Sequence, residues 1–84
     1  MYRIMVIEDN DKIRNELCDF LSKNGYEAFG PAEFDHLLED IHQQKPDLLL
    51  LDLNLPVVDG HFICREVRKN SELPIMIVTS RDSD

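Results

Sequence analysis

The sequence predicts an α/β fold with a doubly wound parallel sheet, its elements running in the order β-α-β-α-β-α-β. Two observations support this fold class. Residues 4–7, 48–51 and 75–78 are short, continuously apolar runs, which are typical of strands buried on both faces. Segments with the apolar spacing of a single helix face lie between the predicted strands. Because the connections are short, this alternation places helices on the faces of one parallel sheet.

The first strand is expected over residues 4–7, and a helix follows it. Asn10 or Asp11 can cap the start of this helix, and Gly25 can end it. Its apolar residues have the i, i+4, i+7, i+8 spacing of one helix face, which we expect to face the core. They are Ile13, Leu17, Phe20 and Leu21.

A weaker second strand is expected over residues 26–30, and a second helix must end before Pro46. The apolar residues of this helix repeat at i, i+3, i+4 and i+7. They are Phe34, Leu37, Leu38 and Ile41. The third strand is the clearest, because four leucines in residues 48–51 run directly into Asp52.

The last predicted helix covers about residues 61–69 and follows a polar, proline-containing loop. Ile63, Cys64 and Val67 lie on one side of it. Ser71 and Pro74 separate this helix from the fourth strand, so the whole chain, residues 1–84, is expected to be one domain.

Composition excludes several classes of protein. The net charge of −8 argues against a nucleic-acid interface, which needs a basic patch to neutralise phosphates. The first apolar run has four residues, too few for a signal peptide or a membrane span. Cys18 and Cys64 lack the spacing of a metal site or a secreted disulfide framework, so we expect reduced thiols in a cytoplasmic protein.

Acidic residues follow two of the predicted strands. Glu8 and Asp9 end the first strand, Asp52 ends the third, and Thr79 follows the fourth. Ligands of open α/β sheets bind beyond the carboxyl ends of the strands, so these side chains are expected to converge. Carboxylates that close together repel one another, and Mg²⁺ with a phosphoryl group would relieve that conflict. The alternative is that such acids are helix caps, which suits Asp11 and less readily Asp9.

Five short motifs together resemble the receiver domains of two-component response regulators, and the resemblance covers the whole chain. They are Glu8-Asp9, Asp52, Leu55-Pro56, Asp59-Gly60 and Thr79-Ser80. The resemblance implies the flavodoxin-like, CheY-like fold, whose strand order is 2-1-3-4-5. It also implies that Pro56 and Gly60 shape the loop beside Asp52.

By the same resemblance, each site residue takes a role. Asp52 is implied to be the phosphoacceptor. Asp9 is implied to bind Mg²⁺ directly, Glu8 through water, and Asn54 through its backbone carbonyl. The hydroxyl of Thr79 would hydrogen-bond the phosphoryl oxygen. The implied donor is a phosphohistidine on a sensor histidine kinase, and the chain would be a phosphoacceptor rather than an enzyme.

The sequence departs from the family's pattern after its fourth strand. Complete receivers continue with a helix, a fifth strand that begins with a lysine, and a final helix, so we expect an incomplete fold here. Mg²⁺ binding needs none of those elements and is expected to survive. The fourth strand would be an exposed apolar edge, and we expect self-association through this edge or through the bare sheet face beside it.

The sequence leaves two alternative functions to consider. A truncated, non-switching interaction or dimerisation module would keep the metal site alone. An aspartyl-phosphate phosphatase of the haloacid dehalogenase type would need a second aspartate two residues after Asp52, where the chain has Asn54. An amide cannot serve as a general acid or base, so this enzyme class is disfavoured.

Overall fold

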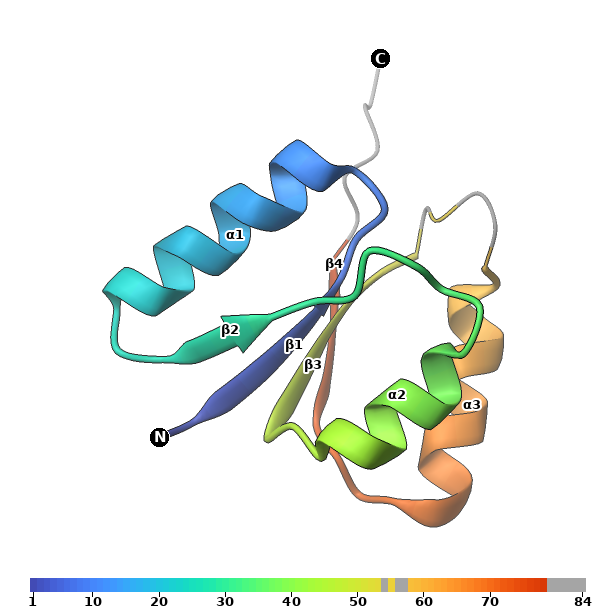
Figure 1. Cartoon of the computed structure of the whole chain (residues 1–84). Helices are drawn as coiled ribbons and strands as arrows, with labels where there is room; N and C mark the ends of the chain where they lie inside the picture. Colours follow the sequence, from blue (N-terminus) through green and yellow to red (C-terminus); the bar gives the residue numbers. More distant parts are fainter. Residues whose placement is uncertain (54, 56–57, 79–84) are drawn as a thin grey trace.

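The computed structural model describes residues 1–53, 55 and 58–78 (Figure 1). In this part of the chain strands and helices alternate in the order expected from the sequence. They are β1 (Arg3–Ile7), α1 (Asp11–Lys23), β2 (Glu27–Phe29), α2 (Leu37–Gln44), β3 (Leu48–Asp52), α3 (Gly60–Asn70) and β4 (Ile75–Val78).

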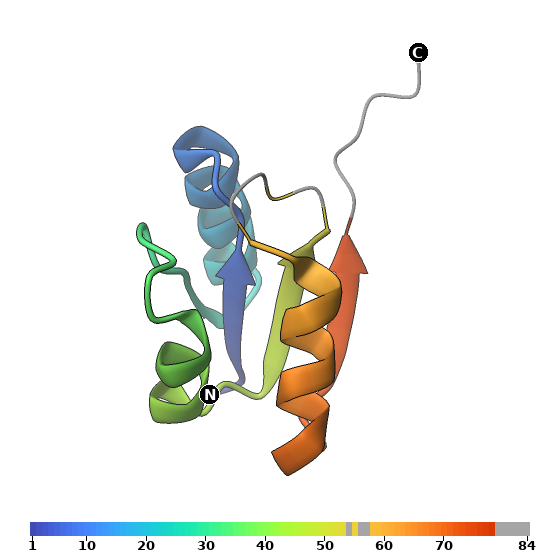
Figure 2. The ribbon, with the colours of Figure 1, turned by 90° about the vertical axis from the view of Figure 1, so that its right-hand side faces the viewer.

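The strands form a parallel sheet in the order β2-β1-β3-β4. Helix α1 lies on one face of this sheet, and α2 and α3 lie on the other (Figures 1 and 2). The prediction of a doubly wound parallel sheet is therefore confirmed. In the register of β1 and β3, Ile7 pairs with Leu51, so β3 ends one residue beyond the end of β1 at the same edge of the sheet.

The main core lies between the sheet and the pair α2 and α3. Alternate residues of β1 and β3 point into it, as expected for side chains that alternate across a strand. Its buried members are Met5, Ile7, Leu37, Ile41, Leu49, Leu51, Leu55, Ile63 and Val67. Each such aliphatic side chain contributes about 1.5–3 kcal/mol on burial.

Helix α1 begins and ends near the predicted residues, but the expected core face is partly wrong. Asn10 is the N-cap and accepts from the Ile13 amide, and Gly25 follows the helix with a φ of 94°. However, Ile13 is 37% exposed and Phe20 is 63% exposed. The less exposed side chains have the spacing i, i+3, i+4, i+7 and are Arg14, Leu17, Cys18 and Leu21. The helix is thus turned so that Arg14 faces inward, because its guanidinium finds hydrogen-bond partners there.

Two predicted helix boundaries also differ. Helix α2 begins at Leu37, so Phe34 precedes it, although this ring still packs against the core. Lys45 ends α2 with a left-handed φ of 49°, one residue before Pro46, as the proline requires. Helix α3 starts at Gly60, one residue earlier than predicted, because Asp59 caps it.

Strand β4 is an edge of the sheet as far as the structure describes the chain. Its exposed side chains are Met76, Ile77 and Val78, and the exposed fraction of Met76 is 54%. An apolar edge strand of this kind was expected from the sequence. Among the described residues, no helix is long and apolar enough to cross a membrane.

Candidate metal centre

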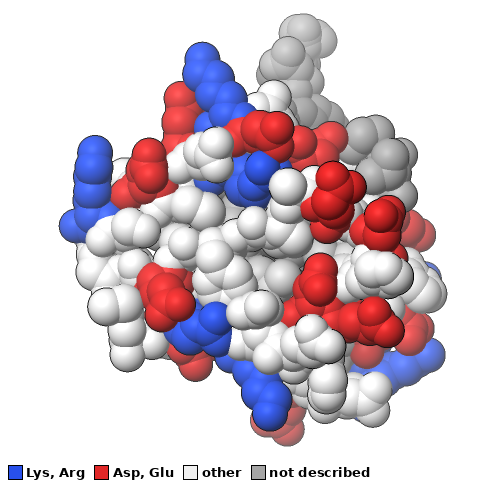
Figure 3. All heavy atoms as spheres, viewed as in Figure 1, with Lys and Arg blue, Asp and Glu red and all other residues white. Residues whose placement is uncertain are grey.

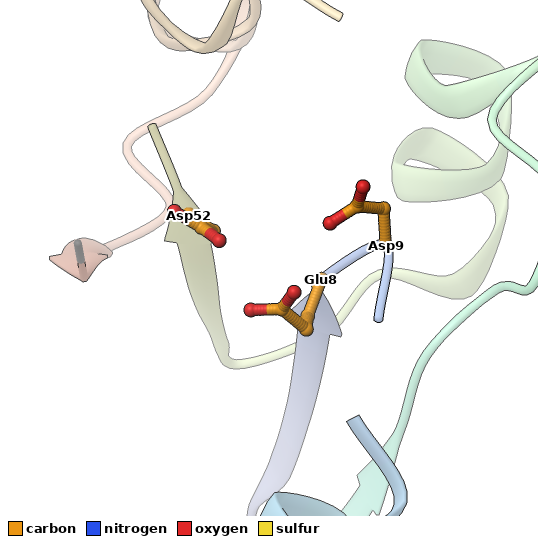
Figure 4. Close-up of side chains that lie close together, drawn as sticks. All are labelled: Glu8, Asp9 and Asp52. Carbon is orange, nitrogen blue, oxygen red and sulfur yellow. The ribbon is translucent and has the colours of Figure 1, made fainter. Parts of the chain in front are cut away.

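The carboxyl ends of β1 and β3 bring three acidic side chains together. The register continues from the Ile7–Leu51 pair, so Glu8 lies beside Asp52, and Asp9 begins the turn into α1. One carboxylate oxygen from each of the three residues lies within 4.8 Å of the others. Figure 4 shows the three carboxylates turned toward one another. The expected convergence of these acids is therefore found.

The three acids differ in their exposure. Glu8 is 5% exposed and Asp52 is 4% exposed, whereas Asp9 is exposed. The backbone amide of Asn10 donates to Glu8 Oε2 at 3.0 Å, which fixes one oxygen of that carboxylate. The buried pair thus lies at the end of the sheet, with Asp9 on the solvent side.

Burial raises the pKa of the Glu8 carboxyl above its ordinary value of 4.5. The hydrogen bond from the Asn10 amide acts in the opposite direction, and the neighbouring carboxyls of Asp52 and Asp9 raise the pKa further. Burial and the neighbouring carboxyls therefore both disfavour the ionised form of Glu8. On the face shown in Figure 3, basic side chains are scattered among acidic ones and form no extended patch over the described residues.

The donor set suits a hard divalent cation. Mg²⁺ prefers oxygen ligands and typically takes one or two protein carboxylates together with water and phosphate oxygens. Glu8, Asp9 and Asp52 offer carboxylate oxygens close enough to share one ion. A bound cation would also offset the repulsion that adds to the effect of burial on the pKa of Glu8.

The start of α3 packs directly behind Asp52. Asp59 caps the helix, accepting from the amides of His61 at 3.0 Å and Phe62 at 3.3 Å. Gly60, which was expected to shape the loop beside Asp52, is the first residue of α3 and is buried. A Cβ at Gly60 would lie 2.8 Å from Leu53 Cδ2, so a glycine lets the helix approach the residue that follows Asp52.

The chain is similar to known proteins in both sequence and fold. Residues 4–84 match the sequence model of the response regulator receiver domain. The chain belongs to this family. The transcriptional regulatory protein YxdJ of Bacillus subtilis is 39% identical over the whole of this chain, which spans 37% of the length of that relative.

Two solved receiver structures are close in fold. The BeF3-activated receiver domain of RstA from Klebsiella pneumoniae is 35% identical, with a TM-score of 0.86, over 98% of this chain and 70% of that one. The regulator TrrA of Thermotoga maritima, solved in complex with the histidine kinase ThkA, is 28% identical with a TM-score of 0.84. That match covers 99% of this chain and 72% of the other. The flavodoxin-like, CheY-like receiver fold expected from the sequence is thus confirmed.

Three residues expected at this receiver's site lie outside the described residues. They are Asn54, Pro56 and Thr79, so their implied roles stay predictions. Arg14 lies beside the site and was not expected there from the sequence. Its guanidinium donates to the Glu8 carbonyl oxygen at 3.0 Å. The signal was an arginine at the spacing of Leu17 and Leu21 on the first helix, which an apolar pattern alone does not reveal.

Proposed function

We propose that the chain is a phosphoacceptor receiver domain, phosphorylated on Asp52 by a histidine kinase in a reaction that depends on Mg²⁺. The observation that carries the proposal is the approach of Glu8, Asp9 and Asp52 to within 4.8 Å of one another at the ends of β1 and β3. Membership of the receiver family supports the phosphoacceptor role.

Two relatives support the finer parts of this proposal. BeF3 has the tetrahedral shape of a phosphoryl group when bound to an oxygen, and it activates the RstA receiver domain. TrrA forms a complex with a histidine kinase. By analogy we assign this chain a histidine kinase as its phosphoryl donor.

The proposed step needs little from the chain beyond position and charge. An oxygen of the Asp52 carboxylate attacks phosphorus in line, an O–P bond forms, and the N–P bond of the phosphohistidine breaks. The imidazole leaves with the electron pair of that bond and takes up a proton. Glu8, Asp9 and Asp52 would hold a bound Mg²⁺, which would offset the negative charge of the phosphoryl oxygens during transfer.

The residues of the chain divide these tasks between them. Asp9 and Glu8 hold the cation, directly and through water respectively. Asp52 presents its nucleophilic oxygen from the rigid end of a buried strand. Asn54 and Thr79 are assigned the backbone-carbonyl contact to the cation and the hydroxyl contact to the phosphoryl group.

Covalent labelling tests this function. The chain is incubated with acetyl phosphate and Mg²⁺, and its intact mass is measured. We expect one added phosphoryl group, which hydroxylamine removes because it is an acyl phosphate. Asp52→Asn and chelation of Mg²⁺ should each abolish the adduct, whereas Asp19→Asn, at an exposed position of α1, should keep it. An adduct that persists in Asp52→Asn would refute the assignment.

A second candidate is a non-switching interaction or dimerisation module that keeps the metal site. The exposed apolar edge of β4 favours it, because an unpaired flat edge pairs readily with another chain. We propose self-association through this edge or through the sheet face beside it. This candidate predicts Mg²⁺ binding without any adduct from acetyl phosphate or from a phosphorylated kinase.

A further inference from the structure

Arg14 is a buried charge beside the acidic cluster. The residue is 7% exposed, although it lies in the first turns of a surface helix. Arginine is almost never buried unless it is paired, because removing its charge from water is costly. Its side chain is paired at two points. Nη1 donates to the Glu8 carbonyl oxygen at 3.0 Å, and Nη2 donates to Asp11 Oδ1 at 2.6 Å.

These two contacts span the turn between β1 and α1. Glu8 follows the last residue of the strand and Asp11 is the first residue of the helix, so Asp9 and Asn10 lie between the two anchors. The guanidinium is a planar fork whose donors have fixed directions. One side chain therefore links the backbone at the start of the turn that carries Asp9 to the Asp11 carboxylate at its end.

The same turn also fixes the Glu8 carboxylate. The Asn10 amide donates to Glu8 Oε2, and the Asn10 side chain accepts from the Ile13 amide. Asn10 can make both contacts only while the β1–α1 turn keeps this conformation. Arg14 thus acts on both acids, on Asp9 through the backbone and on Glu8 through Asn10.

The aliphatic stem of Arg14 is confined from the other side. Gly30 follows β2, and a Cβ built there would lie 3.0 Å from Arg14 Cδ and 2.3 Å from the Val6 carbonyl oxygen. The backbone after β2 therefore passes directly against both β1 and this stem. Confinement of the stem, together with two hydrogen bonds at its tip, leaves the guanidinium little freedom.

We infer that Arg14 is a positioning residue of the metal site, holding the β1–α1 turn in the shape in which Glu8 and Asp9 bind a divalent cation. The inference rests on the proposed function. The positive charge of Arg14 repels a cation and so weakens cation binding, whereas its contacts hold the turn in shape and so strengthen binding. The two contributions to cation affinity therefore have opposite signs. Substitutions at Arg14 that change its shape or its charge can therefore separate the two contributions.

Mg²⁺ affinity of the 84-residue chain, measured by isothermal titration calorimetry, separates the two contributions. Arg14→Lys keeps the charge and loses the fork, so any weakening is geometric. We expect the dissociation constant to rise about tenfold, the lower end of what the loss of a ligand-orienting partner costs. Arg14→Met keeps most of the stem and removes a positive charge, and it too should bind more weakly.

Lys12→Met is the matched control, since Lys12 is an exposed cation in the same first turn. It should bind Mg²⁺ as tightly as the unsubstituted chain, or more tightly. Circular dichroism establishes that each variant is folded at the titration temperature. Hydrogen exchange without metal supplies a second readout: the amides of Asn10 and Ile13 should exchange faster in Arg14→Lys, whereas those of Leu49 and Leu51 should not.

Equal affinity of Arg14→Lys and the unsubstituted chain would overturn the role of Arg14. So would tighter binding by Arg14→Met, which would mark Arg14 as a bystander charge. If the unsubstituted chain binds no Mg²⁺, the proposed function itself fails. The two failures are therefore distinguishable in one set of titrations.

Discussion

Replacing Asp52 by asparagine should stabilise the metal-free protein, even though it removes the proposed phosphoacceptor. Glu8 and Asp52 are both buried, and their carboxylate oxygens lie within 4.8 Å of each other. Two carboxylates at such a distance repel each other, and each also loses hydration on burial. Asparagine has nearly the same shape; because it is neutral, it removes the charge repulsion and lowers the cost of burial.

The size of this effect follows from Coulomb's law. At the 4.8 Å limit, effective dielectric constants of about 80 and about 20 give repulsions of about 0.9 and about 3.5 kcal/mol. We therefore expect Asp52→Asn to raise the free energy of unfolding by about 1–3 kcal/mol at a pH above the raised pKa of Glu8. For a domain of this size, that is an increase in Tm of roughly 5–20 °C.

The assay is thermal unfolding followed by circular dichroism, in a chelator and then with added Mg²⁺. Magnesium should reverse the order of the two proteins. At one thousand times its dissociation constant, a bound ion adds about 4.1 kcal/mol to the unsubstituted chain, which exceeds the expected advantage of the variant. Asp52→Asn, which lacks one of the proposed ligands, should gain much less.

Asp19→Asn is the control for this measurement, because it removes one negative charge from an exposed position of α1. Its Tm should change little in either condition. An Asp52→Asn variant that is no more stable than the unsubstituted chain without metal would refute the repulsion argument. Equal Mg²⁺ stabilisation of both proteins would refute the assignment of Asp52 as a metal ligand.

Three further predictions concern pH, packing and association. Because the folded pKa of Glu8 lies above 4.5, the folded state holds a proton that the unfolded state has lost. The free energy of unfolding without metal should therefore fall as pH rises from about 4.5 through the folded pKa, by at most about 1.4 kcal/mol per pH unit. Urea unfolding across that range should show this slope, and Glu8→Gln should remove it. Gly30→Ala should lower the free energy of unfolding by about 1–3 kcal/mol in the same assay, because the new Cβ would collide with the Val6 carbonyl oxygen. An unchanged urea midpoint would contradict this close packing. Light scattering across a dilution series should show association that Met76→Lys weakens, and a monodisperse monomer at every concentration would rule it out.

The sheet and the acidic cluster could be predicted because the geometry of parallel strands leaves few possible positions for the strand ends. Each apolar run in β1 and β3 ends directly at an acid, and neighbouring parallel strands put their carboxyl ends at one edge. Once β1 lies beside β3, Glu8 and Asp52 must be neighbours. The expectation therefore needed the strand ends, which local sequence carries, and the strand order, which the resemblance to receiver domains implied.

The orientation of α1 was not predictable by the same reasoning. Apolar spacing favoured Ile13 and Phe20 as core residues, yet both are exposed and Arg14 faces inward. What turns the helix is a pair of hydrogen bonds from Arg14 to the β1–α1 turn. Hydropathy records the cost of burying a charge but not the partners that offset it. The early start of α3 was missed for a related reason, since its cap, Asp59, was considered only as part of a loop motif.

The most direct test of the account is a crystal structure of the chain with Mn²⁺ in place of Mg²⁺, using anomalous scattering to locate the metal. We predict one strong peak between the ends of β1 and β3, at about 2.0–2.2 Å from carboxylate oxygens of Asp9 and Asp52, with Glu8 in contact through water. Mn²⁺ bound elsewhere, with these carboxylates facing apart, would contradict the account.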